Sequence, residues 1–433
     1  MKTIGGSSEN QLHRSPEQIK SLLDHGVAAT VAYARIHSPY YRQKLASAGQ
    51  VRGTADLRAL PLTTKNDVSQ FNEQFWRRDH DRFIDICTTS GTTGVPTLYP
   101  MTQADLDRLG YNEYLCFREA GIAPGDIVIL AVTIDKCFMA GLAYFEGLRR
   151  LGATAIRVGA GSPAMLLSMM ERMKATAIVS VPSFLKRVAA YATQQGIDPA
   201  KSTVRKLICI GEPVREPDLR LNPLGQRIAT AWNARIFATY GITELACSLC
   251  ECEAGAGGHL HPELVYLEVL DDAGNALPDG QEGQLVATTI GVEGMPIIRF
   301  ATGDITFMDR SQCRCGQWTP RIGPILGRRD QAMKIKGTTV YPAAVQRVLQ
   351  GVERIIDHVM IATAPTALSD ELEILVAVRG EADEVLEELR EKLRGELKVL
   401  PAVRVATLKE IHDLGHPAEL RKQRVFLDRR RPD

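Results

Sequence analysis

The hydrophobic pattern changes along the chain, and its middle part has the clearest period. Between residues 103 and 240, short apolar runs alternate with segments whose apolar residues recur at helical spacing. The expected strands are 127–133, 153–158, 177–181, 207–210 and 236–238, and the expected helices include 164–174 and 183–194. Short apolar strands that alternate with helices predict an α/β fold with a largely parallel sheet.

The flanking regions follow other patterns. Residues 16–49 carry apolar positions at helical spacing and are expected to be helical. After residue 260, the runs 264–270 and 284–289 flank a turn rich in Gly, Asn and Asp, which predicts antiparallel strands. A smaller unit follows, with a strand at 373–378 and a charged helix at 383–397. We therefore expect an N-terminal domain of residues 1–329 and a C-terminal domain of residues 330–433.

Composition and charge exclude several classes of function. The 433 residues are 45% hydrophobic and 24% charged, and the net charge of +1 disfavours nucleic acid and membrane surfaces as partners. The first residues lack the apolar core of a signal peptide, and Asp135 and Lys136 interrupt the most apolar stretch. Nine cysteines without a secretory signal favour thiols or a metal site over disulfides, and we expect a cytoplasmic protein.

Residues 88–96 read TTSGTTGVP and have the composition of an anion-binding loop. Glycines let backbone N–H groups approach an anion, and hydroxyl side chains add donors. The stretch is not a P-loop, because the lysine of that motif is missing. Taken alone, it is equally typical of a flexible linker.

A second glycine-rich stretch, GAGSPA at Gly159–Ala164, fits the dinucleotide fingerprint G-x-G-x-x-A. A nicotinamide-dependent oxidoreductase would need an acidic residue after the next strand. Pro182 and Ser183 stand there instead, so we interpret the stretch as a tight turn between a strand and a helix.

The order of several motifs is more specific than any one of them. SGTTGxP is followed along the chain by GEP, YGxTE, TGD and GRxDxxxKxKG. In this order they resemble the adenylate-forming superfamily of acyl- and aryl-CoA ligases, over roughly residues 25–430. TQADLDRL (102–109), PSFLKRVAAYA (182–192), GEPV (211–214) and CRCG (313–316) are similar to its phenylacetate–CoA ligase-like branch.

The resemblance implies a fold and a two-step reaction. The implied fold is a large N-terminal α/β domain with mostly parallel sheets and an antiparallel sub-barrel, and a small mobile α+β C-terminal domain. Such enzymes join a carboxylate, here most plausibly an aryl acid, to ATP and release pyrophosphate. A thiol, commonly CoA, then attacks the acyl-AMP. A carrier-protein thiol or an amine is the alternative acceptor.

The resemblance also implies roles for individual residues. Thr243 would touch the α-phosphate, Glu244 would hold Mg²⁺, and Asp304 would bind the ribose hydroxyls. The residues expected to bind ATP or AMP are Thr88, Thr89, Ser90, Gly91, Thr92, Thr93, Gly94, Gly211, Glu212, Pro213, Tyr240, Gly241, Asp304 and Arg328. Val95 departs from the family, which often has lysine there.

The C-terminal domain is implied to complete the site. Lys422 fits the lysine that serves adenylation, although without the resemblance its segment would be interpreted as a basic tail. Asp330 matches the hinge between the two half-reactions, and Lys336 and Gly337 match the loop on the CoA side.

Two further sets of residues are weaker predictions. The resemblance selects Cys252, His259, Cys313 and Cys315 as a structural zinc site, with Cys250 and His261 as substitutes; reduced cysteines in a turn-rich region are the alternative. By position, the acyl pocket would include Phe138, Ala140, Tyr144, Ile242 and Ala246, each of which equally fits core packing. A homodimer is possible within this branch. A non-catalytic relative is disfavoured by the set Glu244, Asp304 and Lys422.

Overall fold

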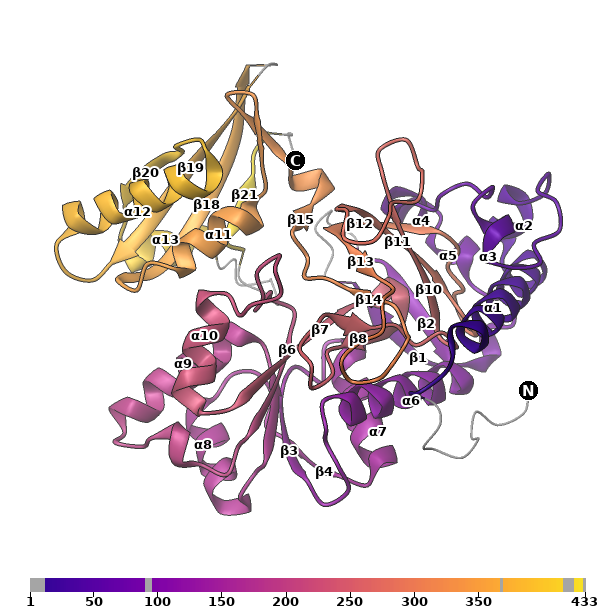
Figure 1. The fold of residues 1–433 in the computed structure, drawn as a ribbon, viewed down its shortest axis with the longest axis horizontal. Coiled ribbons are helices and arrows are strands. Elements are labelled where there is room, and N and C mark those ends of the chain that lie inside the picture. The colour runs from indigo at the N-terminus through magenta and orange to yellow at the C-terminus, as the bar shows by residue number, and fades with distance from the viewer. Residues whose placement is uncertain (1–11, 90–95, 367–368, 416–423, 431–433) are drawn as a thin grey trace. The chain divides into compact units, whose positions relative to one another are not determined.

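The computed structural model describes residues 12–89, 96–366, 369–415 and 424–430 (Figure 1). The chain divides into two compact units, which are described separately. The first comprises residues 1–221, 225–302 and 306–324, and the second comprises 222–224, 303–305 and 325–433. In the described part, no helix is both long enough and apolar enough to cross a membrane.

A six-stranded sheet organises the first unit, in the order β4-β3-β5-β6-β7-β8. Its strands are β3 (Ile127–Ala131), β4 (Thr154–Arg157), β5 (Ala177–Ser180), β6 (Lys206–Ile210), β7 (Arg235–Ile242) and β8 (Cys247–Cys250). All neighbours are parallel except β7 and β8, which form an antiparallel hairpin. The predicted α/β fold with a mostly parallel sheet is confirmed.

Helices cover both faces of this sheet, because its strands are apolar on both sides. They are α6 (Gln103–Glu119), α7 (Met139–Leu151), α8 (Pro163–Met173), α9 (Pro182–Gln194) and α10 (Pro223–Trp232). Figure 1 shows α8, α9 and α10 on one face and α6 and α7 on the other. On the latter face, Phe117 and Leu148 pack against Val128, Leu130 and Val179 in one buried cluster.

The helical prediction for residues 16–49 resolves into two helices, α1 (Pro16–His37) and α2 (Pro39–Lys44). Ser38 ends the first and caps the second, since its side chain accepts a hydrogen bond from the Tyr41 amide. Pro39 has no amide hydrogen to continue α1 but suits the first position of α2. The short helices α3 (Thr54–Leu57), α4 (Lys65–Gln70) and α5 (Asn72–Phe75) follow.

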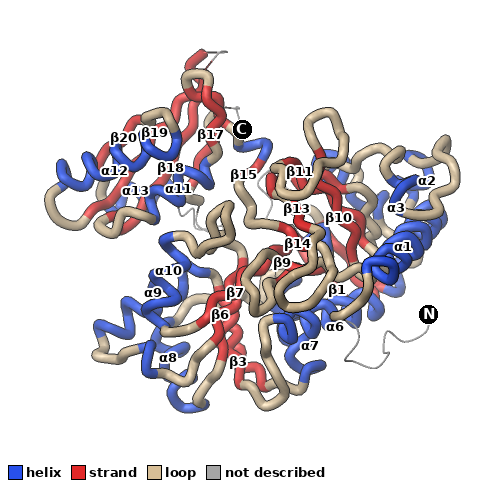
Figure 2. The backbone as a smooth tube through the Cα atoms, in the orientation of Figure 1, coloured by secondary structure: helices blue, strands red, loops and turns tan. Residues whose placement is uncertain are grey.

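The remaining strands of the first unit are antiparallel, as predicted for 264–270 and 284–289. They are β1 (Phe83–Thr88), β2 (Leu98–Thr102), β9 (Gly258–His259), β10 (Val265–Leu270), β11 (Gly283–Thr289), β12 (Phe300–Thr306), β13 (Met308–Asp309) and β14 (Arg321–Ile322). Residues 303–305 in the middle of β12 belong to the second unit. β10 pairs with β11 in full register from Val265–Thr289 to Leu270–Gln284. Figure 2 shows loops between these strands. Cys313 and Cys315 lie in the loop between β13 and β14.

The second unit has a sheet in the order β20-β19-β18-β21. Its elements are β15 (Gly327–Arg328), β16 (Met333–Ile335), β17 (Thr338–Val340), α11 (Pro342–Gln350), β18 (Ile355–Thr366), β19 (Ser369–Val378), α12 (Ala382–Leu397), β20 (Ala402–Val405), α13 (Leu408–Gly415) and β21 (Phe426–Asp428). Residues of α11 and α12 share one buried cluster with the sheet, and Ile411 of α13 belongs to another. The unit is therefore an α+β sandwich with its own core.

Candidate functional site

The flanks of the predicted phosphate loop are fixed by backbone hydrogen bonds. Thr88 ends β1, and its amide donates to the carbonyl of Cys137 over 2.9 Å. The Thr89 amide donates to the Thr97 carbonyl over 3.1 Å, which closes the two ends of the loop. The predicted contacts Ser90, Gly91, Thr92, Thr93 and Gly94, together with Val95, lie outside the described residues.

Two predicted ATP motifs follow neighbouring parallel strands. Gly211–Pro213 come directly after β6, and Thr243 and Glu244 come directly after β7. The carboxyl ends of adjacent parallel strands meet at one edge of the sheet, which is where α/β folds bind ligands. The Glu212 carboxylate accepts hydrogen bonds from the amide and the hydroxyl of Ser183, over 2.8 and 2.6 Å, at the start of α9. This contact ties the loop after β6 to the one after β5.

The tip of the β7–β8 hairpin presents the second motif. Thr243–Leu245 form a single 3₁₀ turn, and Ala246 closes it in the left-handed conformation with φ of 47°. Thr243 and Glu244 are half-buried. Below them, burial together with the negative charge of Glu244 raises the pKa of Tyr99 well above its usual value. The Tyr99 hydroxyl is buried and has no hydrogen-bond partner within the described part of the chain.

One expectation about this motif is wrong. Tyr240 and Gly241 were expected in a loop after a strand that ends at 238, but they belong to β7, which continues to Ile242. The return strand explains the difference, because Tyr240 pairs with Leu249 and Gly241 with Ser248. A pairing partner from later in the chain extends the strand beyond its apolar run.

Asp304 and Arg328 face each other within the second unit. They are register partners on β12 and β15, and the Arg328 Nε donates to the Asp304 carboxylate over 3.0 Å. Asp304 is only 2% exposed, so its ion pair is shielded from water on the aspartate side. Gly303 precedes it with φ of 79°, a left-handed conformation that favours glycine.

The other predicted residues of the second unit lie on its surface. Asp330 is exposed in a 3₁₀ turn after β15. Lys336 and Gly337 form the two-residue turn between β16 and β17, with φ of 48° and 84°, as a type I′ hairpin requires. Lys422 lies outside the described residues.

The residues predicted for the acyl pocket are placed in two regions. Tyr144 is buried against Phe117 in the core beneath the sheet, and Ala140 packs on the same core. Phe138 precedes α7 and is half-buried. Ile242 and Ala246 flank the hairpin tip. Their role towards a substrate stays a prediction.

The predicted metal quartet is brought together. The ligand atoms of Cys252, His259, Cys313 and Cys315 all lie within 4.8 Å of one another. The Sγ atoms of Cys252 and Cys313 are 3.7 Å apart, and Cys315 Sγ lies 3.6 Å from His259 Nε2. Tetrahedral zinc with Zn–S bonds of about 2.3 Å holds its sulfur ligands about 3.8 Å apart. The quartet thus already has the spacing of a tetrahedral site.

Hydrogen bonds and charges around His259 also suit a metal. The Thr319 hydroxyl donates to Gln317 Oε1 over 3.3 Å, so it accepts from His259 Nδ1 over 2.7 Å. This turns Nε2 towards the thiols. Burial opposes a charge on His259, but the surrounding cysteines outweigh it and raise its pKa to about 12. In the metal-free protein Nε2 therefore carries a proton among the thiols, and a metal ion would take the place of that proton.

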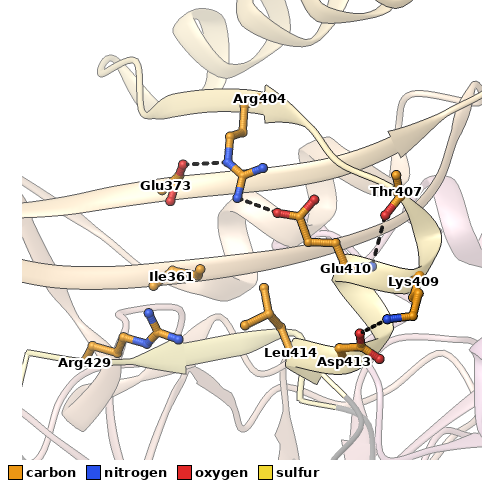
Figure 3. Close-up of a pocket in the computed structure, with 9 residues that line it drawn as sticks. All are labelled: Ile361, Glu373, Arg404, Thr407, Lys409, Glu410, Asp413, Leu414 and Arg429. Atoms are coloured by element: carbon orange, nitrogen blue, oxygen red, sulfur yellow. Dashed lines mark hydrogen bonds and ion pairs between the residues drawn. The ribbon is translucent and has the colours of Figure 1, made fainter.

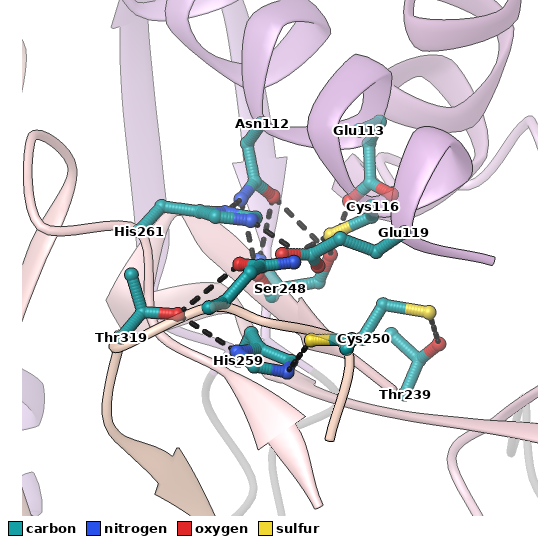
Figure 4. A network of polar contacts seen from close by, with 12 residues as sticks. Asn112, Glu113, Cys116, Glu119, Thr239, Ser248, Cys250, His259, His261 and Thr319 are labelled. Atoms are coloured by element: carbon teal, nitrogen blue, oxygen red, sulfur yellow. Dashed lines mark hydrogen bonds and ion pairs between the residues drawn. The ribbon is translucent and has the colours of Figure 1, made fainter. Parts of the chain in front are cut away.

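The two substitute ligands lie elsewhere, which corrects that part of the prediction. Cys250 is buried in the core beneath the sheet and accepts a hydrogen bond from Thr239. His261 belongs to a second cluster with Cys116 and Glu119, whose ligand atoms also lie within 4.8 Å of one another (Figure 4).

This second cluster does not fit a metal. The Ser248 amide donates to Asn112 Oδ1 over 2.7 Å, so the Asn112 Nδ2 group must donate to Ser248 O and to His261 Nδ1, over 3.0 and 2.8 Å. His261 Nδ1 therefore accepts, and the ring proton sits on Nε2, 3.4 Å from the Glu119 carboxylate. A metal would need that Nε2 lone pair.

A hollow of about 500 Å³ on the second unit contains none of the predicted residues. Figure 3 shows that its walls are ion-paired: Arg404 contacts Glu373 and Glu410, and Lys409 contacts Asp413. With these charges already paired at an exposed surface, the hollow offers little to select a ligand.

Several residues around the site were missed from the sequence. Thr319 orients His259, and Asn112 and Arg108 hold the strand after the hairpin tip. Arg108 and Asn112 stand in TQADLDRLGYNE without a motif of their own. Arg108, Asn112 and Cys116 are each four residues apart, which places them on one face of a helix. This spacing is the only signal in the sequence that could have suggested their shared role.

Comparison with known proteins agrees with these observations. Residues 15–293 match the model of the family described as AMP-binding enzyme. The phenylacetate–coenzyme A ligase of Thermus thermophilus is 28% identical over 88% of this chain and 90% of its own. The phenylacetate–coenzyme A ligase of Pseudomonas putida is 29% identical over 85% of this chain and 84% of its own. A solved structure of 2-hydroxyisobutyryl-CoA ligase in the postadenylation state superposes with a TM-score of 0.84 at 23% identity. The match covers 99% of this chain and 94% of that one. The predicted family is confirmed, and this chain belongs to the AMP-binding enzymes.

Proposed function

We propose that this chain activates a carboxylic acid, in the first instance an aryl acid, with ATP and transfers it to the thiol of CoA. Membership of the AMP-binding family carries the proposal. The placement of Gly211–Pro213 and Thr243–Glu244 at the ends of adjacent strands supports it. The choice of an aryl acid follows the phenylacetate ligases among the relatives.

The chemistry divides among residues of the first unit. A carboxylate is a poor electrophile, and its transfer to AMP makes it a good one. Glu244 is the acidic residue at the hairpin tip and would hold Mg²⁺, which neutralises phosphate charge when bound. Thr243 would donate to the α-phosphate, and Glu212 and Pro213 would line the adenine.

Residues of the second unit would complete the reaction. The Asp304 carboxylate, held by Arg328, would accept hydrogen bonds from the ribose hydroxyls. Lys422 would stabilise charge between the α-phosphate and the acid. We further propose that residues 330–433 act as a lid that turns at Asp330 and brings Lys336 and Gly337 to the CoA side.

The quartet Cys252, His259, Cys313 and Cys315 would bind one structural zinc ion. Three thiolates and one imidazole leave no open position for a substrate, which is the composition of a closed structural site. The ion would join the segment after β8 to the loop of CRCG, two parts of the chain that are distant in sequence.

The proposed activity is tested by acid-dependent exchange of pyrophosphate into ATP. A panel of aryl and fatty acids would be used with Mg²⁺, followed by thioester formation with and without CoA. We expect exchange with an aryl acid and a CoA thioester as product. Exchange with no acid in the panel would contradict the proposal. Exchange without a thioester would point to a carrier protein or an amine as the acceptor.

The role of Lys422 has its own test. Lys422→Ala should lose pyrophosphate exchange yet still convert synthetic acyl-AMP and CoA to the thioester. Lys409→Ala is the control, because Lys409 lies on α13 of the same unit and is exposed. Wild-type exchange by Lys422→Ala would exclude the assignment.

A further inference from the structure

One face of α6 buries polar side chains, which is unusual because polar residues on helices normally face solvent. The residues recur at steps of three and four and are each at most 4% exposed: Asp105, Arg108, Asn112, Cys116 and Glu119. We call them the α6 stripe. Buried polar groups must be hydrogen-bonded, so the partners of the stripe show what it holds.

Arg108 holds the exit of the hairpin tip. Its guanidinium is 2% exposed and donates to three carbonyl groups, those of Ile290, Ala246 and Leu264. Ala246 is the residue that closes the 3₁₀ turn of Thr243–Leu245. It has φ of 47° without being glycine, so its conformation is strained and needs support from outside the turn.

Asn112 holds the strand that follows. β8 is an edge strand, and its amide and carbonyl groups at Ser248 face away from β7. The Asn112 side-chain amide pairs with both of them, as a neighbouring strand would (Figure 4). The free edge of β8 is thereby closed by one side chain.

The backbone of the hairpin tip is a single 3₁₀ turn. Its 3₁₀ turn has no side-chain cap, and one backbone hydrogen bond, from the Ala246 amide to the Thr243 carbonyl, closes it. β7 is fixed on one side by β6, whereas the return through Ala246 and Ser248 is fixed on its outer side by α6. The position of Glu244 along the sheet edge therefore depends on the pairing of β7 with β6 and on the contacts between α6 and the return strand.

We propose that Arg108 and Asn112 are positioning residues for the adenylation step. They set the place of Thr243 and Glu244, and thereby of the Mg²⁺ that Glu244 would hold, without touching substrate themselves. The inference rests on the proposed function. It adds that a buried helix face, rather than the ATP motif alone, determines the Mg²⁺ affinity of this site.

The test compares Arg108→Met with Arg108→Lys and the wild type, after circular dichroism has established folding. In Arg108→Met we expect the Mg²⁺ concentration for half-maximal pyrophosphate exchange to rise about tenfold, and kcat for adenylation to fall about a hundredfold, as misplacement of a reacting group by 1 Å can cause. Conversion of synthetic acyl-AMP and CoA to the thioester should stay within about twofold of wild type, because it needs no Mg-ATP. Arg108→Lys keeps a hydrogen-bond donor, so its Mg²⁺ requirement and its kcat should lie between those of Arg108→Met and the wild type.

Asp105→Asn is the matched control. Asp105 belongs to the same stripe and is equally buried, but it accepts from the amides of Glu293 and Gly294 rather than holding the hairpin. We expect it to lower stability and leave the Mg²⁺ requirement unchanged.

Three outcomes decide the inference. An unchanged Mg²⁺ requirement in Arg108→Met, with active wild type, would overturn it. Equal losses in both half-reactions would also overturn it, since they would indicate a purely structural role. If Arg108→Met does not fold, Arg108→Lys decides: a wild-type Mg²⁺ requirement there contradicts the inference. Absence of exchange in the wild type would instead refute the proposed function.

Discussion

His259 and His261 are two residues apart, yet the Nδ1 atoms of their imidazoles have opposite hydrogen-bonding roles. Thr319 accepts a hydrogen bond from His259 Nδ1 and turns Nε2 towards three cysteines. Asn112 donates to His261 Nδ1 and leaves the proton on Nε2, beside Glu119. Both clusters have the composition of a metal site, but only the first has the hydrogen bonds of one.

The comparison shows that the neighbours of a ligand decide its chemistry more than the ligand itself does. The closeness of the ligand atoms does not separate the two clusters, because in both they lie within 4.8 Å of one another. The single partner of each Nδ1 separates them, because that partner decides whether Nε2 can donate a lone pair. The first cluster is thus a metal centre in our proposal, and the second is a polar clamp on β8.

The largest effect should come from removing a ligand of the quartet. Cys313→Ser should abolish the zinc that we propose for the wild type and lower the free energy of unfolding by roughly 4 kcal/mol, as loss of a structural metal does. Mass spectrometry of the native protein and urea unfolding measure both. Cys116→Ser, in the second cluster, is the control and should keep the full zinc content.

Glu113, a buried acid beside the second cluster that accepts a hydrogen bond from the Ser248 hydroxyl over 2.6 Å, should respond to pH instead. Burial raises the pKa of Glu113 to about 7, so the folded protein binds this proton more tightly than the unfolded chain, whose pKa is near 4.5. The resulting penalty is absent below about pH 4.5, grows as the carboxyl ionises, and reaches about 3 kcal/mol above pH 7. Glu113→Gln removes this penalty, because glutamine does not ionise.

Urea unfolding at pH 5 and pH 8 tests whether the penalty from Glu113 grows as the pH rises. The gain in stability of Glu113→Gln over wild type should be larger at pH 8. Glu253→Gln, at a largely exposed acid, should show equal effects at both values. A gain for Glu113→Gln that is equal at both pH values would show that Glu113 titrates normally.

Asn112→Leu should break the clamp without disturbing the metal. It leaves the Ser248 amide and His261 Nδ1 buried without their partner and removes one of two donors to the Ser248 carbonyl, which costs about 2 kcal/mol. Zinc content should stay at one ion per chain. Loss of zinc in this variant would mean that the two clusters are not independent.

Thr319→Ala should have the smallest effect and sharpen the comparison most. It removes the acceptor of His259 Nδ1 while all four ligands remain, so zinc affinity should fall about tenfold. Competition with a chelator measures the affinity. Thr306→Ala, a buried threonine that donates to the Gly323 carbonyl, is the control for the lost hydroxyl. Equal affinities in the two variants would show that Thr319 does not orient the ligand.

Local patterns of the sequence were sufficient for the framework of the fold. The alternation of short apolar runs with helices predicted β3, β5 and β6, because strands buried on both faces are continuously apolar. It missed the end of β7, since Tyr240 and Gly241 are strand residues only through pairing with β8. The local spacing of apolar residues in the sequence does not encode such pairing.

The candidate site was predictable only in part. The order of motifs, through resemblance, selected the four residues of the quartet that the fold brings together. The same reasoning offered His261 as a substitute, because no local signal reveals that Asn112 is its neighbour. Arg108 escaped for a related reason: a charged residue in a helix normally indicates an exposed face, and here it lies on a buried one.

The central claim is that the β7–β8 hairpin tip activates the acid, and one rate tests it most directly. Acid-dependent pyrophosphate exchange is compared in the wild type, Glu244→Gln and Glu253→Gln. Loss of the carboxylate that we propose holds Mg²⁺ should slow exchange by about a hundredfold or more, whereas Glu253→Gln should match the wild type. Exchange by Glu244→Gln at the wild-type rate would contradict the account.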